Sequence, residues 1–322
     1  MKSKSIPNTY QTSQRVNELN KQWNIKKTPG DAEGVQISFK ESLEEQVARL
    51  QRKGDLEEDV IRVKISGDGT CIGKRLKLVN ITFTILNEKG AAMSEKGNYV
   101  LAILKTTESY DNLKESLSDL TTEMSKLSKV EVGGKHYNIE YFLGEDWKFL
   151  ACVCGLGAAN QDHACIWCKC PRNLRHDIQR VWSLSNSAQG ARSLEEIANY
   201  AKSKKLNCKA TPLFSFIPLD HVIIDTLHLF LRISDNLTEL LIRELRRKDA
   251  CDKATFQNGF SREKFQHMAR YEAFLKNLGI SFEWRINKDT KKLDYRDLTG
   301  PEKLTVMQKT FTSLPFCQVT KI

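Results

Sequence analysis

Two aspartates of this 322-residue sequence each follow a predicted strand and are of the type that binds divalent metal. Asp68 lies in SGDGT, after the alternating run VIRVKI, and Asp146 comes soon after the run HYNIEYFL. Carboxylate oxygens are the ligands that Mg²⁺ and Mn²⁺ prefer, and two or three of them suffice because waters complete the shell. Two such ions can activate a water or a 3′-hydroxyl on a phosphodiester and stabilise the leaving oxygen.

Each aspartate also has an ordinary structural interpretation. An Asp between glycines after a strand is usually a turn former, and Glu145-Asp146 before an apolar helix is typical of a helix cap. In the functional interpretation, Gly67 and Gly69 let a phosphate backbone approach Asp68. The joint placement of the two acids after two strands is what favours a shared site.

The sequence has nine cysteines, five of them between Cys152 and Cys170. Cys165 and Cys168 form a CxxC pair, with which two thiolates can hold one Zn²⁺, so we expect half of a zinc site. Plain thiols and a redox pair remain alternatives, although no thioredoxin-like βαβ unit surrounds the pair. Cys152 and Cys154 are expected to be core thiols. The local candidates for further ligands are His163, Cys170, His176, His221 and His228.

Two more groups of polar residues admit a functional and an ordinary interpretation. Asp220, His221, Asp225 and His228 could ligate a metal from one helix, but Asp220 as a cap and packed histidines explain them more simply. The basic residues that follow the CxxC could meet phosphates or form a solvated face. They are Lys169, Arg172, Arg175 and Arg180.

The elements expected to position Asp68 and Asp146 follow the order β-β-β-α-β-α. Hydrophobic periodicity predicts strands at 60–65, 76–86, 99–104 and 136–143, and helices at 41–53, 109–127, 147–156, 193–202, 220–247, 261–278 and 302–311. Asp68 then falls in a turn at 66–70. This order opens an RNase H-like sheet, in which the first and fourth strands are neighbours.

We therefore predict an α/β fold, an RNase H-like mixed sheet followed by a mostly helical region. The expected organisation is a basic flexible leader at 1–33, an RNase H-like domain at 34–160, and a zinc half-site with an incomplete, helical insertion-like region at 161–322.

Composition narrows the class of protein. Lys and Arg number 50 against 40 for Asp and Glu, which gives a net charge of +10 and suits a polyanionic partner such as DNA. No apolar run reaches the roughly 20 residues of a membrane-spanning helix. The polar start, Met1 to Tyr10, lacks the apolar core of a signal peptide. We expect a nuclear or cytoplasmic protein with no membrane partner.

Several of these segments together resemble a known family. KISGDGT, ITFTIL, Asp146 placed 19 residues before Cys165, and CIWC resemble the catalytic core of the V(D)J recombinase catalytic subunit (the recombination-activating protein) and of Transib-type DDE transposases. RVWSLSNSAQGARSLEEI and PLDHVIIDTLHL continue the similarity, which covers about residues 60–245. The chain also resembles uncharacterised invertebrate proteins that carry GxDWKFLA and ACIWCKCP and look like domesticated or relic relatives.

The resemblance implies a DNA recombinase with two divalent metals, Mg²⁺ or Mn²⁺, that nicks DNA and attacks with the freed 3′-hydroxyl. Asp68 matches the first catalytic Asp and Asp146 the second, while Cys165 and Cys168 match two zinc ligands. The family's remaining zinc ligands, two histidines, and its third acid, a Glu, lie far downstream and match no residue here. Its amino-terminal DNA-reading domain has no counterpart either.

From these parts we predict a transposable-element-derived, DDE recombinase-like protein that binds DNA, truncated at its carboxyl end. Weak metal binding and impaired cleavage are expected, and a homodimer is a second partner to consider. The alternatives are a non-catalytic DNA- or protein-binding module and a zinc-stabilised structural protein.

Overall fold

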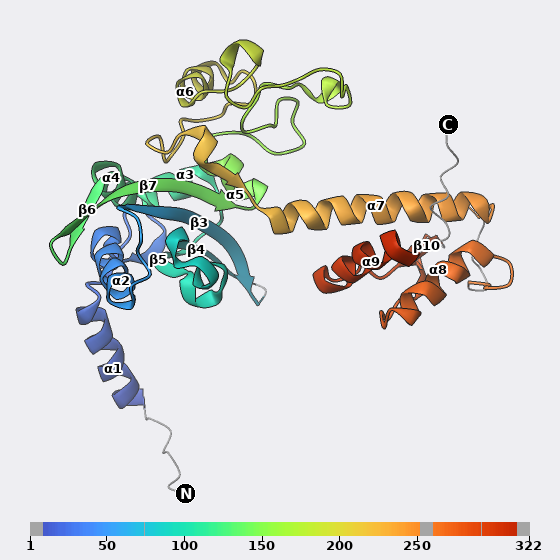
Figure 1. The fold of residues 1–322 in the computed structure, drawn as a ribbon, viewed down its shortest axis with the longest axis horizontal. Coiled ribbons are helices and arrows are strands. Elements are labelled where there is room, and N and C mark those ends of the chain that lie inside the picture. Colours follow the sequence, from blue (N-terminus) through green and yellow to red (C-terminus); the bar gives the residue numbers. More distant parts are fainter. Residues whose placement is uncertain (1–8, 74, 252–259, 291, 314–322) are drawn as a thin grey trace, which may run out of the picture. The chain divides into compact units, whose positions relative to one another are not determined.

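The computed structural model describes residues 9–73, 75–251, 260–290 and 292–313, and the chain divides into two compact units between Asp225 and Thr226. The first unit is a mixed α/β structure around an eight-stranded mixed sheet, and the second is mostly helical (Figure 1). In the described part of the chain, no helix is long and apolar enough to cross a membrane.

The first unit begins with two helices and two short strands of the sheet. Up to the middle of the sheet its elements are α1 (Thr9–Gln22), β1 (Lys26–Lys27), β2 (Glu33–Gln36), α2 (Phe39–Lys53), β3 (Val60–Ile72), β4 (Leu76–Ile85), the 3₁₀ helices η1 (Leu86–Met93) and η2 (Glu95–Gly97), and β5 (Tyr99–Lys105). It continues with α3 (Tyr110–Ser116), α4 (Ser118–Lys126), β6 (Lys129–Val132), β7 (Lys135–Glu145), α5 (Trp147–Val153), η3 (Arg172–Leu174), η4 (Ser187–Gln189), α6 (Leu194–Ser203), η5 (Leu219–His221) and β8 (Val222–Ile224).

The strands of the sheet lie in the order β1-β2-β5-β4-β3-β7-β6, and β8 pairs with β7. β3 runs parallel to β7, with Ile65 opposite Leu143, and antiparallel to β4, with Asp68 opposite Asn80. β8 is also parallel to β7. The prediction that the first and fourth strands of the β-β-β-α-β-α series are neighbours is therefore confirmed.

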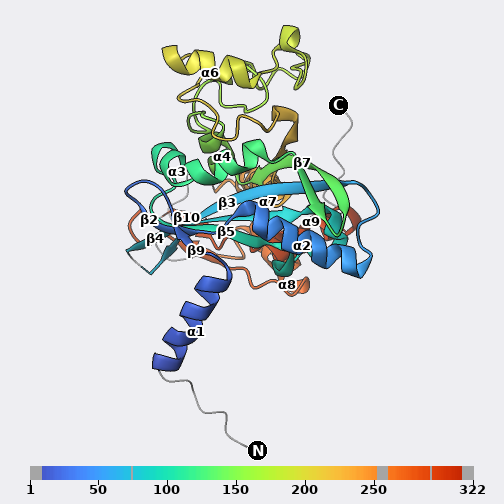
Figure 2. The same cartoon turned by 90° about the vertical axis from the view of Figure 1, so that its left-hand side faces the viewer.

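Helices cover one face of the sheet around β3 and β7. Phe39 of α2 lies 5.5 Å from Phe83 and 5.8 Å from Tyr141, measured between ring centroids. The ring of Phe149 on α5 lies over Gly67. Val63 pairs with Tyr141, Ile65 with Phe83 and Gly67 with Ile81, and paired residues point to the same face. Phe39 and Phe149 therefore belong to one apolar layer, and Figure 2 shows α2 beside the strands.

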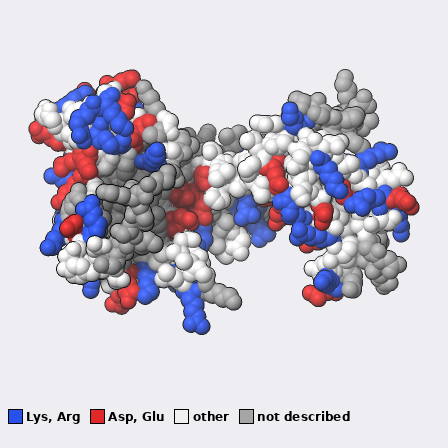
Figure 3. Space-filling view, turned by 90° about the horizontal axis from the view of Figure 1, so that it is seen from below, with Lys and Arg blue, Asp and Glu red and all other residues white. Residues whose placement is uncertain are grey.

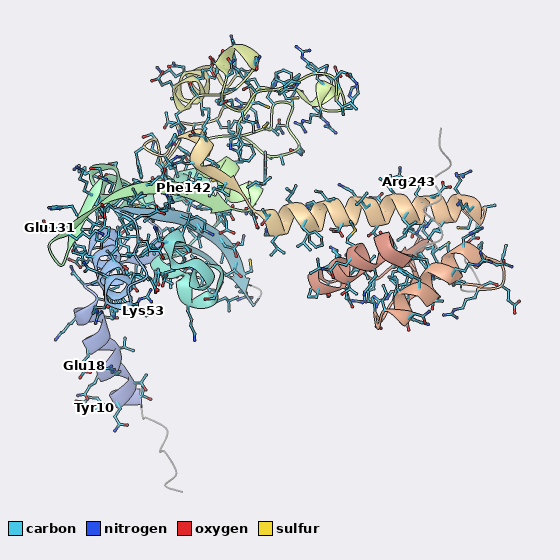
Figure 4. All side chains as sticks on the ribbon, viewed as in Figure 1. Tyr10, Glu18, Lys53, Glu131, Phe142 and Arg243 are labelled. Atoms are coloured by element: carbon cyan, nitrogen blue, oxygen red, sulfur yellow. The ribbon has the colours of Figure 1, made fainter. Side chains whose placement is uncertain are left out.

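The opposite face of β3 and β7 is polar and half-buried. Arg62 Nε donates to Glu140 Oε2 at 3.2 Å across the two strands. The imidazole of His221 stacks on Phe142 with 4.4 Å between ring centroids, on the strand where Figure 4 labels Phe142. His221 Nδ1 also lies 2.8 Å from the carbonyl oxygen of Tyr141.

A carboxylate from far along the chain caps helix α2. Glu123 of α4 accepts hydrogen bonds from Ser38 Oγ at 2.6 Å, from Phe39 N at 3.0 Å and from Lys40 N at 3.2 Å. These N–H groups have no partner within a helix, so an acidic acceptor satisfies them and favours the positive helix end. The last turn ends at Gly54 in the left-handed region, φ 74°.

Three local predictions are wrong, for different physical reasons. SGDGT is not a turn, since β3 continues through it to Ile72 while paired with β4. The helix predicted at 109–127 is two helices that break at Leu117 (φ −101°, ψ 6°), although both keep the apolar side buried. Residues 222–224 are a strand and not the start of a helix, because a short apolar run fits either structure.

The amino-terminal segment is more ordered than the predicted loose leader. Residues 9–22 form α1, and β1 and β2 extend the sheet by pairing β2 with β5. The sequence also gave no sign of β6, which forms a hairpin with β7 across Gly133 and Gly134, both with positive φ.

The second unit contains α7 (Thr226–Lys248), α8 (Gln266–Asn277), the hairpin β9 (Trp284–Ile286) and β10 (Leu293–Tyr295), and α9 (Gly300–Ser313). Its core gathers Met268 and Leu275 of α8, Ile242 of α7 and Phe282, all almost wholly buried. Glu272 is buried and accepts hydrogen bonds from Arg262 at 2.6 Å and Lys276 at 2.9 Å.

Candidate active site

Asp68 and Asp146 lie at matching positions on neighbouring strands. The register of β3 and β7 pairs Ile65 with Leu143, and each aspartate is the third residue beyond that pair. Asp68 is exposed and Asp146 is half-buried. Ser66 Oγ donates to the carbonyl oxygen of Gly144 at 2.5 Å, so the two strands remain in contact next to the acids.

The interpretation of Asp146 as a helix cap is confirmed. Capping uses one oxygen of the carboxylate and leaves the other available. Asp146 is the N-cap of α5, and its Oδ1 accepts a hydrogen bond from Phe149 N at 2.8 Å. Because this bond fixes the side chain at the end of β7, capping also holds the carboxylate in place beside β3.

The predicted role of the glycines around Asp68 is wrong. A Cβ on Gly67 would lie 2.3 Å from the ring of Phe149, and one on Gly69 would lie 2.8 Å from Glu108 Oε2. Both glycines therefore make room for side chains of this chain on the helix-covered face. They do not form an opening through which a phosphate backbone reaches Asp68.

Two other acids lie close to these strands, Glu145 near Asp68 and Glu108 against Gly69 on the helix-covered face, and the sequence analysis gave them no role. Burial, followed by the negative charge of Asp68, raises the pKa of Glu145 above its usual range. The Glu108 side chain is 4% exposed, and its Oε2 accepts a hydrogen bond from Lys148 Nζ at 2.8 Å. Its Oε1 is buried without a hydrogen-bond partner among the described residues. Nothing in the sequence around Glu108 marks it as a site residue, because it is an ordinary acid shortly before a helix.

A third strand brings one more acid to the same edge. β8 pairs in parallel with β7, with Glu145 opposite Ile224, so Asp225 follows at the level of Asp146. The helix predicted at 220–247 includes Asp225 and would give it no relation to Asp146, but Asp225 lies between β8 and α7. The signal that could have found it is the apolar run VII before an acid, the same pattern that precedes the other two.

The chemistry of these carboxylates suits Mg²⁺ or Mn²⁺, and the buried Glu108 oxygen without a partner is the kind of atom that a cation satisfies. Their spacing does not form a finished site. No group of three or more His, Cys, Asp or Glu side chains that could hold a metal ion is found where the structure describes the chain. Asp68 and Asp146 would thus have to close around an ion with help from a third oxygen.

Cys165 and Cys168 lie together in a loop that a buried arginine organises. Arg192 Nε donates to the carbonyl oxygens of Cys165 at 2.9 Å and Cys168 at 3.0 Å, and its Nη2 donates to those of His163 at 2.8 Å and Leu206 at 2.9 Å. Arg192 is 6% exposed. A buried guanidinium that satisfies four carbonyls fixes the loop that carries both thiols.

The pKa values of the two thiols shift in opposite directions. A hydrogen bond from the Cys168 thiol and N–H donors of Trp167 and Cys168 lower the pKa of Cys165, and the same pairing raises that of Cys168. N–H groups directed at a CxxC sulfur suit a metal-bound thiolate. Only two ligands are brought together, however, because the described cysteines and histidines form no larger metal group.

The other predicted ligands have other contacts or lie elsewhere. His163 Nδ1 is 3.1 Å from Asp162, and His176 is exposed. Cys170 is buried and its Sγ is 3.5 Å from the carbonyl oxygen of Pro171. His221 packs on Phe142 as described, which agrees with the ordinary interpretation, while His228 belongs to the second unit. Asp220 lies within η5 and does not cap a long helix.

The basic strip after the CxxC is partly bound within the chain. Lys169 Nζ donates to Glu196 at 2.9 Å, and Arg175 Nη2 donates to the carbonyl oxygens of Gln161 and Asp162 at 2.8 and 2.6 Å. Arg180 lies over the ring of Trp182. Figure 3 shows basic and acidic side chains interspersed on the face that it presents. No single basic face is visible there.

Comparison with known proteins gives no assignment: neither the models of protein families nor the curated proteins match this chain.

Proposed function

We propose that the first unit is an RNase H-like core of the DDE recombinase type, which binds DNA and a divalent metal through Asp68 and Asp146. The observation that carries this proposal is the parallel pairing of β3 with β7, which sets the two acids at matching positions. In the order β5-β4-β3-β7-β8, β4 alone runs antiparallel to β3, which agrees with this architecture.

The residues of the chain have distinct parts in this proposal. Asp68 is exposed, so a DNA backbone can reach it from solvent. Asp146 is held by its bond to Phe149 N and offers its second oxygen. Bound Mg²⁺ or Mn²⁺ would supply Lewis-acid chemistry at the scissile phosphate. Two carboxylates without a third ligand hold an ion loosely, so we expect weak metal binding and slow nicking.

The test is nicking of supercoiled plasmid DNA in Mn²⁺ or Mg²⁺, together with Mn²⁺ binding measured by electron paramagnetic resonance. Asp68→Asn and Asp146→Asn keep the side-chain shape, and Asn can still cap α5. Glu131→Gln is the matched control, an exposed acid on β6 that Figure 4 labels, next to the opposite end of β7. We expect the nicking rate and the Mn²⁺ affinity to fall at least about tenfold in the two Asn variants only, because each of them loses a charged ligand. Equal metal binding in all four proteins would refute the site.

A non-catalytic DNA-binding module is the second candidate, because the net charge is +10 while the acids form no finished metal group. It predicts DNA affinity that falls with salt concentration and does not change with Asp68→Asn. Fluorescence anisotropy with labelled duplex DNA at several salt concentrations separates the two functions.

A further inference from the structure

Helix α7 carries two apolar faces, and among the described residues one of them is packed and the other is exposed. Ser234, Ile242 and Leu245 are buried against the core of the second unit. The other face carries four aliphatic side chains that are 41%, 47%, 44% and 54% exposed, namely Leu229, Ile233, Leu237 and Leu240. We call these four residues the α7 stripe.

The α7 stripe is a continuous surface along the helix. Its members are four, four and three residues apart, and at 100° per residue they fall within an arc of about 80°. Polar residues such as Arg232 and Glu239 lie together on the flank of the stripe that is remote from the packed face. Exposed aliphatic side chains that line up in this way mark an interaction surface more often than scattered ones do.

We infer that two copies of this chain pair through the α7 stripe, with their α7 helices antiparallel about a two-fold axis. In a symmetric interface, each residue of one copy meets its counterpart in the other reciprocally. The stripe has the required symmetry. Ile233 and Leu237 lie equally far from Asp235, and Leu229 and Leu240 are almost centred on the same point.

Antiparallel pairing about this point brings the aliphatic residues together. Leu229 of one copy lies opposite Leu240 of the second copy, and Ile233 lies opposite Leu237 of the second copy. Every exposed member of the stripe is then covered, and both ends of the interface are identical. A three-four spacing of apolar residues is also the pattern that packs side chains into the gaps of a facing helix.

Charge complementarity favours a second copy as the occupant. Arg232 and Glu239 are both exposed and are centred on nearly the same point as the stripe. In the antiparallel arrangement, Arg232 of each copy faces Glu239 of the other, so two ion pairs flank the apolar contacts. Parallel pairing about a two-fold axis along the helices would instead place the Arg232–Glu239 flanks of the two copies on opposite sides of the contact, so these ion pairs would not form.

Sedimentation velocity of the whole chain over a wide range of concentration tests the interface. We expect a monomer–dimer equilibrium that Leu237→Glu weakens at least about tenfold, because a charge enters the centre of the contact. Leu304→Glu is the matched control, because Leu304 of α9 is a similarly exposed leucine, 47%, outside the stripe. Thermal unfolding verifies that both variants fold. A chain that is monomeric at every concentration, or a dimer that Leu237→Glu leaves intact, overturns the inference.

A charge exchange tests the antiparallel arrangement. Arg232→Glu is expected to weaken the dimer about threefold or more, and Arg232→Glu combined with Glu239→Arg to restore most of the loss. The exchange also places two arginines four residues apart, because Arg243 pairs with Glu239 in α7 at 3.3 Å. The comparison is therefore repeated with Arg243→Gln in all variants. A double variant that is as weak as Arg232→Glu, or weaker, would exclude the antiparallel contact.

Discussion

Glu108 accepts a hydrogen bond from Lys148 at 2.8 Å, while its other carboxylate oxygen is buried without a partner among the described residues. Lys148 lies two residues after Asp146, and Glu108 lies against Gly69 beside Asp68. The pair therefore lies on the helix-covered face of β3, next to α5, whose N-cap is Asp146. Lys148 is exposed on one side, so a cation of another kind can compete with it for the carboxylate.

We predict that Lys148→Met lowers the free energy of unfolding by about 2 kcal/mol, because a largely buried carboxylate loses its cationic partner. Saturating Mn²⁺ should recover part of this loss, since the ion can take the place of the ammonium. Denaturant unfolding with and without Mn²⁺ measures both effects. Lys114→Met, an exposed lysine of α3, is the control and should change little. A deficit that Mn²⁺ does not alter would separate Glu108 from the metal site.

We predict that Gly67→Ala destabilises the protein by about 1–3 kcal/mol, because the new methyl group would meet the Phe149 ring. Phe149→Leu creates space, so the double variant should be more stable than the sum of the two single effects. Gly90→Ala, where a Cβ meets nothing within 4 Å, is the control. Thermal denaturation measures the stability of each variant. If the effects of Gly67→Ala and Phe149→Leu are strictly additive, the Phe149 ring does not restrict position 67.

We predict that Arg192→Lys costs about 2–4 kcal/mol of stability, because an ammonium cannot satisfy four carbonyl oxygens in the plane of a guanidinium. The same change should reduce the zinc that remains bound after dialysis, measured by atomic emission, as Cys165→Ser should. The control is Arg180→Lys, on an exposed loop. Unchanged stability in Arg192→Lys would mean that the CxxC loop is fixed by other contacts.

We predict that the second unit loses stability as the pH falls from about 4.5 to about 2. Arg296 and the N–H and hydroxyl of Thr299 lower the pKa of Glu302 to about 2. A carboxylate with a depressed pKa in the folded state contributes stability above its unfolded value, and protonation removes it. Glu302→Gln should flatten this part of the pH profile, as measured by melting temperature. Glu283→Gln is the control, and a parallel profile in Glu302→Gln would contradict the assignment.

Strand positions near β3 and β7 could be predicted because their patterns are local. The alternation in VIRVKI and the β-branched run of β4 define strands without tertiary information. The helix predicted at 193–202 is present as α6, and Ser193 and Glu196 have the spacing of a capping box and form one. Parallel pairing of β3 with β7 followed from the order of elements, and with it the matching placement of Asp68 and Asp146.

What escaped prediction depends on contacts between distant segments. The apolar run VII became β8 because β7 offers it an open edge, and only that pairing places Asp225 near Asp146. Glu108 depends on Lys148 and Gly69, which no sequence spacing relates to it. In the sequence, Arg192 is indistinguishable from other basic residues. Its role follows only from the four carbonyl oxygens that surround it in the fold.

The cap that Glu123 places on α2 also constrains the order of folding. Helix α2 leaves the ribosome well before Glu123 is synthesised, and β2 likewise waits for β5. Docking of the amino-terminal segment onto the sheet therefore follows formation of the β3–β5 meander and α4, although it is made first. We therefore expect Glu123→Gln to accelerate unfolding more than it slows refolding, which stopped-flow unfolding and refolding rates would measure.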